Sequence, residues 1–411
     1  MSVGFRLRGR QVKKGLLGMF KGKSNIFEEI AKYLKENARP ELPGYLRFMS
    51  AEAMEFELCP FDEPLRFEMD GDEFFVDGHT SAGGAGYHKY ACDLLKGMPG
   101  KVAIEWLPSD ANSGDETGYW ESGNPKDIED AMHNWLDGLV GVLKENSDKG
   151  ADSLMINMAI GGPYTVVNRG ITTPQGTKTF EDFAAITPEN AYLMWPWPLP
   201  EPHFLAGYAR YLMANEVIWD KPLDDEESRS LTFVNGLLER AEKSDENLDL
   251  PYREWAEVRQ LLGLPKDSHL QMKAELSSGP LIGYRRGFLL HTILEDVKFN
   301  MPGIMRTTWE ENTFQMWDSK HVVHINFYLM PELPADMKQE VPDWFVMPSN
   351  LDNGVVQILQ SSFEDSEAVH IFKLFKDNHV MLMTLVGLEG EDPDWFNSVF
   401  SWFEISDISV S

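Results

Sequence analysis

The chain has 411 residues, 43% hydrophobic and 12% aromatic, a composition typical of a folded globular protein with more than one domain. Its 66 acidic and 37 basic residues give a net charge of −29, which repels nucleic-acid phosphates, so we expect no nucleic-acid partner. No run of about 18 apolar residues is present, and we therefore predict no transmembrane segment.

The N-terminal arm differs in charge from the rest of the chain. Residues 1–24 carry seven lysines and arginines and no acidic residue, so the remainder carries −36. Val3, Phe5 and Leu7 alternate with cations, which predicts an edge strand whose charges face solvent or the protein's own acidic surface. Contact with a membrane or an acidic partner is the alternative. The arm lacks the apolar stretch of a secretory signal and the chain has two cysteines, so we expect a cytoplasmic protein.

The next part of the chain predicts a layered domain. Residues 24–37 have the apolar spacing of an amphipathic helix, and Asp70-Gly71 between two β-rich runs predicts a hairpin. Residues 87–98 and 125–145 each place apolar side chains on one face, as helices that cover a sheet do. Residues 153–162 predict a buried strand.

The middle and the end of the chain differ in the secondary structure that their residue patterns predict. Prolines and tryptophans of residues 195–204 predict a rigid connector that is not helical and packs on its own domain, with docking to another protein as the alternative. Three helical patterns follow, and from residue 281 the pattern becomes β, closed by an aromatic helix that Asp394 can cap. We predict an α+β fold with four segments: a basic strand and helix (1–44), a mixed α/β layered domain with a glycine-rich loop (45–195), a proline-rich connector with a helical segment (196–275), and a C-terminal antiparallel sheet with a terminal helix (276–411).

The stretch TSAGGAGYHK, residues 80–89, has the composition of a ligand-contacting loop. Its three glycines lie between a predicted strand and a predicted helix, where backbone amides can bind an anion. It matches neither common nucleotide-binding pattern, and a tight structural turn is the alternative. The residues that would contact a ligand are Ser81, Gly83, Gly84, Gly86 and Tyr87, and those that would act as acid or base are His88 and His79.

Other candidate groups are scattered. Asp110, Asp115 and Glu116 gather in a turn-rich loop that could supply oxygen ligands for a hard cation or could simply face solvent. Arg285 and Arg286 could grip a carboxylate or phosphate, or neutralise neighbouring acids. Cys92 lies one helical turn from His88, which suggests either an activated thiol or an ordinary buried side chain. We expect no cofactor.

The segments AVHIFKLFKDNHVMLMTLVGL and DPDWFNSVFSWFEI form a strand pair and an aromatic helix at the end of the chain. They resemble the last hairpin and helix of the PsbP/Mog1-like α+β domains, a group that includes the DcrB-like proteins. The resemblance covers roughly the last quarter of the chain and implies a non-catalytic binding module, because relatives serve as assembly factors or as chaperones for secreted effectors. It assigns no functional residue.

Together these patterns favour a non-catalytic, cytoplasmic, bacterial interaction protein of adaptor, chaperone or immunity type. We expect it to bind another protein, possibly a basic one, through an acidic and aromatic surface. The alternative is a hydrolase or transferase that acts on a small anionic ligand at the glycine-rich loop.

Overall fold

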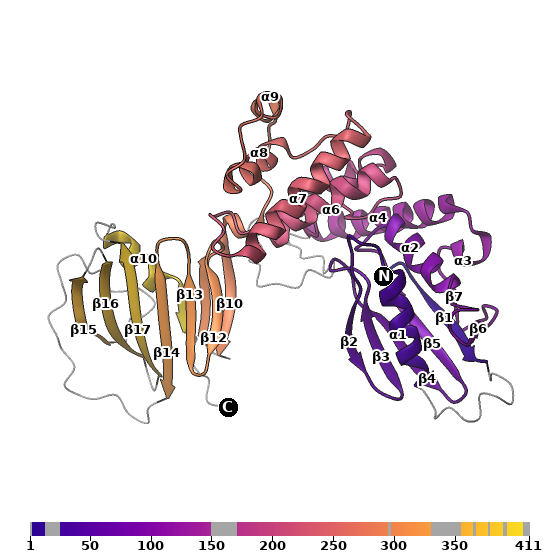
Figure 1. Cartoon of the computed structure of the whole chain (residues 1–411), viewed down its shortest axis with the longest axis horizontal. Helices are drawn as coiled ribbons and strands as arrows, with labels where there is room; N and C mark the ends of the chain where they lie inside the picture. Colours follow the sequence, from indigo (N-terminus) through magenta and orange to yellow (C-terminus); the bar gives the residue numbers. More distant parts are fainter. Residues whose placement is uncertain are drawn as a thin grey trace.

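The computed structural model describes residues 2–12, 25–148, 171–294, 297–329, 355–364, 367–376, 379–388 and 393–405. It confirms an α+β fold, and Figure 1 shows an N-terminal sheet and a C-terminal sheet with a group of helices between them. One cluster of buried apolar side chains runs from Val3 to Leu270, and a second from Phe299 to Trp402. The segments 1–44, 45–195 and 196–275 therefore share one core. Within the described residues, no helix combines the length and apolar character needed to cross a bilayer.

The N-terminal sheet is antiparallel, with strand order β2-β3-β4-β5-β1-β6 and a short β7 that pairs with β1. The strands are β1 (Gly4–Gln11), β2 (Tyr45–Met49), β3 (Ala53–Glu57), β4 (Leu65–Asp70), β5 (Glu73–His79), β6 (Ile104–Trp106) and β7 (Gly114–Asp115). The expected hairpin joins β4 and β5, with Gly71 at φ +65°. The expectation that the first strand lies at an edge is wrong, because β1 pairs with β5 on one side and with β6 and β7 on the other.

Helices cover one face of this sheet, and charges cover the other. Helices α1 (Ile26–Asn37) and α2 (Ala85–Lys96) lie against each other, since the Tyr33 hydroxyl donates to the Leu94 carbonyl at 3.0 Å. The short α3 (Tyr119–Ser122) and the long α4 (Pro125–Asp148) pack on α2. On the opposite face the cations of β1 pair with the protein's own acids, as Arg6 does with Asp77 at 2.9 Å. The remaining cations of the arm, Lys13, Lys14, Lys21 and Lys23, lie outside the described residues.

The helical region follows the N-terminal sheet in the chain. Its elements are β8 (Ile171–Thr173), β9 (Gly176–Lys178), α5 (Phe180–Ala184), η2 (Pro188–Leu193), α6 (Glu201–Asn215), α7 (Asp225–Ser244), α8 (Tyr252–Leu261) and α9 (Ser268–Leu276). The proline-rich segment packs on its own domain, with Trp195 and Trp197 buried. Its last residues correct the expectation of a non-helical connector: they form the first turn of α6, where the missing N–H of Pro202 costs nothing. The strand predicted at 153–162 lies outside the described residues.

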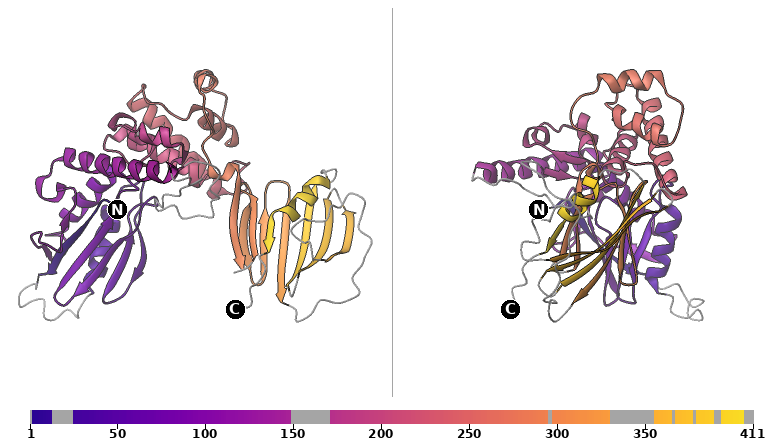
Figure 2. Two further views of the ribbon diagram at one scale, coloured as in Figure 1. Left: turned by 180° about the vertical axis from the view of Figure 1, so that it is seen from behind. Right: turned by 90° about the vertical axis from the view of Figure 1, so that its left-hand side faces the viewer.

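The C-terminal region contains a three-stranded sheet and a six-stranded antiparallel sheet of order β12-β13-β14-β17-β16-β15. Its elements are η3 (Tyr284–Arg286), β10 (Phe288–Leu294), β11 (Val297–Pro302), β12 (Arg306–Glu310), β13 (Thr313–Trp317), β14 (Val322–Leu329), β15 (Val355–Glu364), β16 (Glu367–Lys376), β17 (His379–Leu388), α10 (Pro393–Ser401) and β18 (Phe403–Ile405). Figure 2 shows α10 lying across one face of the larger sheet. The expectation that Asp394 caps this helix from outside is wrong, because α10 begins at Pro393 and Asp394 is the second residue of its first turn.

Candidate functional site

The glycine-rich loop, residues 80–86, is a joint between α2 and the segment that precedes α6. The Gly83 amide donates to the Oδ2 atom of Asp62 at 2.7 Å, and the Gly86 amide donates to the Trp197 carbonyl at 2.9 Å. The Trp197 amide in turn donates to the Gly83 carbonyl at 2.9 Å. The amides that would form an anion cradle are therefore engaged within the protein.

The glycines of this loop are needed for close approach. Gly84 has φ +97°, and a Cβ there would lie 2.7 Å from the Cβ of Trp195. A Cβ on Gly86 would lie 2.5 Å from the Pro198 carbonyl oxygen. The Ser81 carbonyl accepts a hydrogen bond from the Trp195 indole at 2.9 Å, and Tyr87 is fully buried. A ligand would have to displace these contacts to reach the loop.

Asp62 occupies the position that an anion would take beside the loop. Burial raises the pKa of its carboxyl to about 8, although hydrogen bonds from the Gly83 and Glu63 amides act in the opposite direction. The side chain is 7% exposed. This carboxyl group thus fills the helix N-terminus from within the fold.

His88 lies at the centre of a buried polar cluster beneath the sheet. Its Nδ1 atom is 2.8 Å from the Thr80 hydroxyl. Its Nε2 atom is 3.1 Å from Asp115 Oδ1, 3.2 Å from the Thr117 hydroxyl and 3.6 Å from Cys92 Sγ. The His88 and Asp115 side chains have no exposed surface, so the cluster is closed to a substrate.

The chemistry of the cluster is that of a structural or metal-holding site. Burial raises the pKa of the Cys92 thiol well above its usual range, which leaves no thiolate for nucleophilic attack. Burial also tends to raise the pKa of Asp115, but the hydrogen bond with His88 and those from the Thr117 and Trp120 amides hold it below its usual value. Ligand atoms of His88, Cys92 and Asp115 lie within 4.8 Å of one another, so these three side chains could hold a metal ion.

The other residues singled out in the sequence do not converge on this cluster. His79 is exposed, and its Nδ1 lies 3.0 Å from the Ser2 hydroxyl. The Asp110 carboxylate pairs with Arg8 at 2.9 Å, and the Glu116 carboxylate accepts from the Gly4 amide at 2.8 Å. Asp110, Asp115 and Glu116 thus have three different sets of partners, although all three line one surface pocket together with His79.

The two consecutive arginines, Arg285 and Arg286, are engaged locally. Arg286 makes two hydrogen bonds to the Glu257 carboxylate and lies 3.5 Å over the Trp219 ring, while Arg285 donates to the Gly303 carbonyl at 3.0 Å. This arrangement matches the alternative in which these cations neutralise and order their own surroundings.

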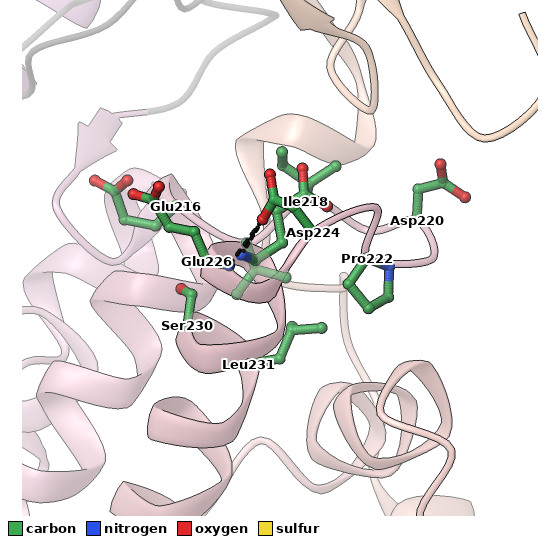
Figure 3. Close-up of a pocket in the computed structure, with 10 residues that line it drawn as sticks. Glu216, Ile218, Asp220, Pro222, Asp224, Glu226, Ser230 and Leu231 are labelled. Atoms are coloured by element: carbon green, nitrogen blue, oxygen red, sulfur yellow. Dashed lines mark hydrogen bonds between the residues drawn. The ribbon is translucent and has the colours of Figure 1, made fainter.

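A pocket of about 290 Å³ lies between the end of α6 and the start of α7. Its acidic lining residues are Glu216, Asp220, Asp224, Glu226 and Glu227, and its other lining residues are Val217, Ile218, Pro222, Ser230 and Leu231. We call it the acidic pocket. In Figure 3 the Asp224 carboxylate caps the amide of Glu226, with Glu216 on one side and Asp220 on the other.

Charge in the acidic pocket is only partly compensated. Arg306 pairs with Asp220 and Glu227, at 2.8 Å in each case. In the described part of the chain, Glu216, Asp224 and Glu226 have no cation within ion-pair distance. From the sequence, the acidic residues before α7 indicate only the start of a helix. The pocket could not be predicted, because Glu216 comes from the end of α6 and no sequence pattern links it to these acids.

Comparison with known proteins gives little additional information. No family model and no curated protein matches the chain. One similar solved structure is a Bacteroides thetaiotaomicron VPI-5482 protein, 9% identical, with a TM-score of 0.20; the match covers 28% of this chain and 46% of that protein. Another is the cyanobacterial PsbP protein of Synechocystis sp. PCC 6803, 12% identical, with a TM-score of 0.16; the match covers 32% of this chain and 99% of that protein. The likeness to PsbP is weak at these scores.

Proposed function

We propose that this protein is a non-catalytic interaction protein, of adaptor, chaperone or immunity type, that binds a basic protein partner through the acidic pocket. The observation that carries this proposal is the gathering of three carboxylates without a cationic partner, those of Glu216, Asp224 and Glu226, around one pocket of about 290 Å³. We expect a lysine or arginine side chain of the partner to enter it.

The lining of the acidic pocket suits such a side chain. Ile218, which is half-buried in the pocket wall, offers apolar surface to the methylene stem of a lysine or arginine, while the carboxylates meet its charged head. Leu223, in the loop between the lining residues, is 43% exposed and offers an apolar contact beside the pocket. The net charge of −29 attracts a basic partner from a distance and makes binding weaken as salt is added.

A non-catalytic role is supported because the groups that could act on a substrate are either hydrogen-bonded within the protein or buried. The amides of Gly83 and Gly86 donate within the protein, and His88 is closed to solvent. A general acid or base must lie within hydrogen-bond reach of a substrate atom. The enzyme alternative at the glycine-rich loop therefore requires a rearrangement that the interaction proposal does not.

The proposal is tested with a fluorescein-labelled pentalysine peptide, whose binding to the full chain is followed by fluorescence anisotropy. We expect Glu216→Gln/Glu226→Gln to weaken binding at least fivefold, because two of the three unpaired carboxylates are lost. The matched control is Asp70→Asn/Asp72→Asn, which removes two exposed acids from the β4-β5 turn and should change binding by less than about twofold. Equal weakening in the two double variants would mean that only the overall charge matters, and would contradict the proposal.

A further inference from the structure

A second pocket, of about 900 Å³, lies beside the β8-β9 hairpin, and we call it the hairpin pocket. The hairpin contributes Gln175 and Lys178, and α6 contributes Arg210. Lys178 and Arg210 are 32 positions apart in the chain but line the same cavity. The pocket is lined by four cations and four acidic residues. Of the other two cations, Lys273 pairs with Glu242 and Arg253 donates to the Gly279 carbonyl. Lys178 and Arg210 have no carboxylate partner among the described residues, and their position in one cavity needs a physical explanation.

Arg210 is buried with no carboxylate of the described residues within ion-pair distance, although the charges of Asp249 and Glu254 act on it. The residue is 8% exposed, and its Nη2 atom donates to the Asp249 carbonyl at 2.6 Å. Its Nε atom is buried and has no hydrogen-bond partner in the structure. An arginine side chain normally occupies such a position only when an anion satisfies its donors, because an unpaired buried charge is costly.

Lys178 likewise forms no salt bridge with the residues that the structure describes. No acidic group of the described residues lies within 4.0 Å of its ammonium, although Asp182, Glu246, Asp249 and Glu254 also line the pocket. Burial, followed by repulsion from Arg210, lowers the pKa of Lys178 to about 8, and Asp182 and Asp249 only partly offset this effect. The charge of Arg210 thus adds to the cost of an ammonium at Lys178, and both side chains line the same cavity.

Gln175 adds a hydrogen-bond acceptor to the two cations. Its side-chain amide donates to the Gly207 carbonyl at 2.7 Å, which leaves the Oε1 atom buried and without a donor. The pocket thus combines cations that need an acceptor with an acceptor that needs a donor. An anion that also carries an O–H or N–H group meets both requirements.

We propose that the hairpin pocket binds a small organic anion, a phosphate or carboxylate that also bears a hydroxyl or amino group, between Lys178 and Arg210. The anionic group takes the free donors of the two cations, and the hydroxyl or amino group donates to Gln175. Binding of one anion replaces the repulsion between the two cations with attraction to a shared partner. This site is separate from the acidic pocket, and none of the described residues lines both.

The test uses the full chain and four probes in isothermal titration calorimetry at constant ionic strength. Glycerol 3-phosphate and lactate each carry an anionic group with a hydroxyl, glycerol carries only hydroxyls, and inorganic phosphate carries only the anion. We expect glycerol 3-phosphate or lactate to bind, inorganic phosphate to bind at least tenfold more weakly than the better of these two, and glycerol not to bind. Which of the two binds distinguishes a phosphate site from a carboxylate site, and failure of both would overturn the proposal.

Variants locate the binding. Lys178→Gln should weaken binding of the better probe at least tenfold, whereas Lys126→Gln, on an exposed lysine paired with Asp130 at 2.8 Å, should leave it unchanged. If both variants bound the probe equally weakly, the probe would not bind at Lys178, and the proposal would be contradicted. A measurement on the unmodified chain guards against misfolding of the variant: acetic anhydride should modify Lys178 at least fivefold more slowly when the better probe is present, with Lys126 as the internal reference. Unchanged modification of Lys178 would also overturn the proposal.

Discussion

Arg306 and Glu227 form a bidentate salt bridge, in which the Nε and Nη2 atoms of the arginine each donate to one carboxylate oxygen at 2.8 Å. Arg306 begins β12 of the C-terminal sheet, and Glu227 lies in the first turn of α7. The same guanidinium donates to Asp220 at 2.8 Å and to the Lys221 carbonyl at 2.9 Å. One nearly buried side chain thus connects the C-terminal region to the helical region.

Replacing Arg306 should be costly, because two partly buried carboxylates would lose their only cation in the described residues. We expect Arg306→Met to lower the free energy of unfolding by about 2–4 kcal/mol in urea titrations followed by tryptophan fluorescence. Arg306→Lys should recover little of it, since one ammonium cannot make the bidentate contact. Lys126→Met, which breaks an exposed pair, should cost less than about 0.5 kcal/mol. A loss for Arg306→Met as small as for this control would show that the connection contributes no stability.

Asp62 should make stability depend on pH in the direction opposite to that of an ordinary carboxylate. Its pKa is about 8 in the folded chain, against roughly 3.9 unfolded, so the folded state binds more protons between these values. Stability is therefore lost as pH rises from about 4 to 8. Asp62→Asn cannot ionise, and its stability relative to the wild type should increase steadily between pH 5 and 8. Parallel denaturation midpoints for the two proteins across this range would refute the assignment, and Asp70→Asn, in an exposed turn, serves as control.

Lys178 should show a second pH effect of opposite sign. Its pKa of about 8 lies below the unfolded value of roughly 10.4, so the unfolded state binds more protons between these values and wild-type stability rises with pH there. Below pH 8 the folded chain bears the full cost of the buried ammonium. In anion-free buffer we expect Lys178→Met to be more stable than wild type by about 1–2 kcal/mol at pH 7, an advantage that disappears by pH 10. A constant difference between pH 7 and 10 would mean that the ammonium is well solvated.

Elements with local signals could be predicted from the sequence. Asn25 accepts a hydrogen bond from the Phe27 amide and begins α1, as its residue type suggests, and Gly71 adopts the φ +65° that its turn requires. The position of β1 could not be predicted, because its register, with Leu7 opposite Val76, joins residues far apart in the chain. An alternation of apolar and charged residues specifies which face is buried but not which strands pair.

For the candidate sites, too, the sequence does not reveal which residues from distant parts of the chain come together. The composition of residues 80–86 indicates that something approaches the backbone closely, and it cannot distinguish a ligand from Trp195 and Trp197. His88 and Cys92 are one helical turn apart and visible as a pair, whereas Asp115 reaches them only because β7 pairs with β1. Lys178 and Arg210 have no motif that links them, and only the folded helical region brings them to one cavity.

The contact between the glycine-rich loop and residues 195–198, the tryptophan segment, allows a test of whether the loop serves for packing or for ligand binding. A methyl group on Gly86 would lie 2.4 Å from the Trp197 ring and 2.5 Å from the Pro198 carbonyl, both too close for real contacts. The backbone of α2 or of the tryptophan segment would have to move. We therefore expect Gly86→Ala to lower the free energy of unfolding by about 2–4 kcal/mol and to alter tryptophan fluorescence.

The matched control for Gly86→Ala is Gly138→Ala, also within a helix but with no atom within 4 Å of the added carbon. This change should stabilise the chain by about 0.5–1 kcal/mol, because alanine favours helix more than glycine does. If Gly86→Ala is instead tolerated as well as Gly138→Ala, the tryptophan segment does not press on the loop in solution, and the loop amides are free for another partner. That outcome would restore the ligand-binding interpretation of Gly83, Gly84 and Gly86.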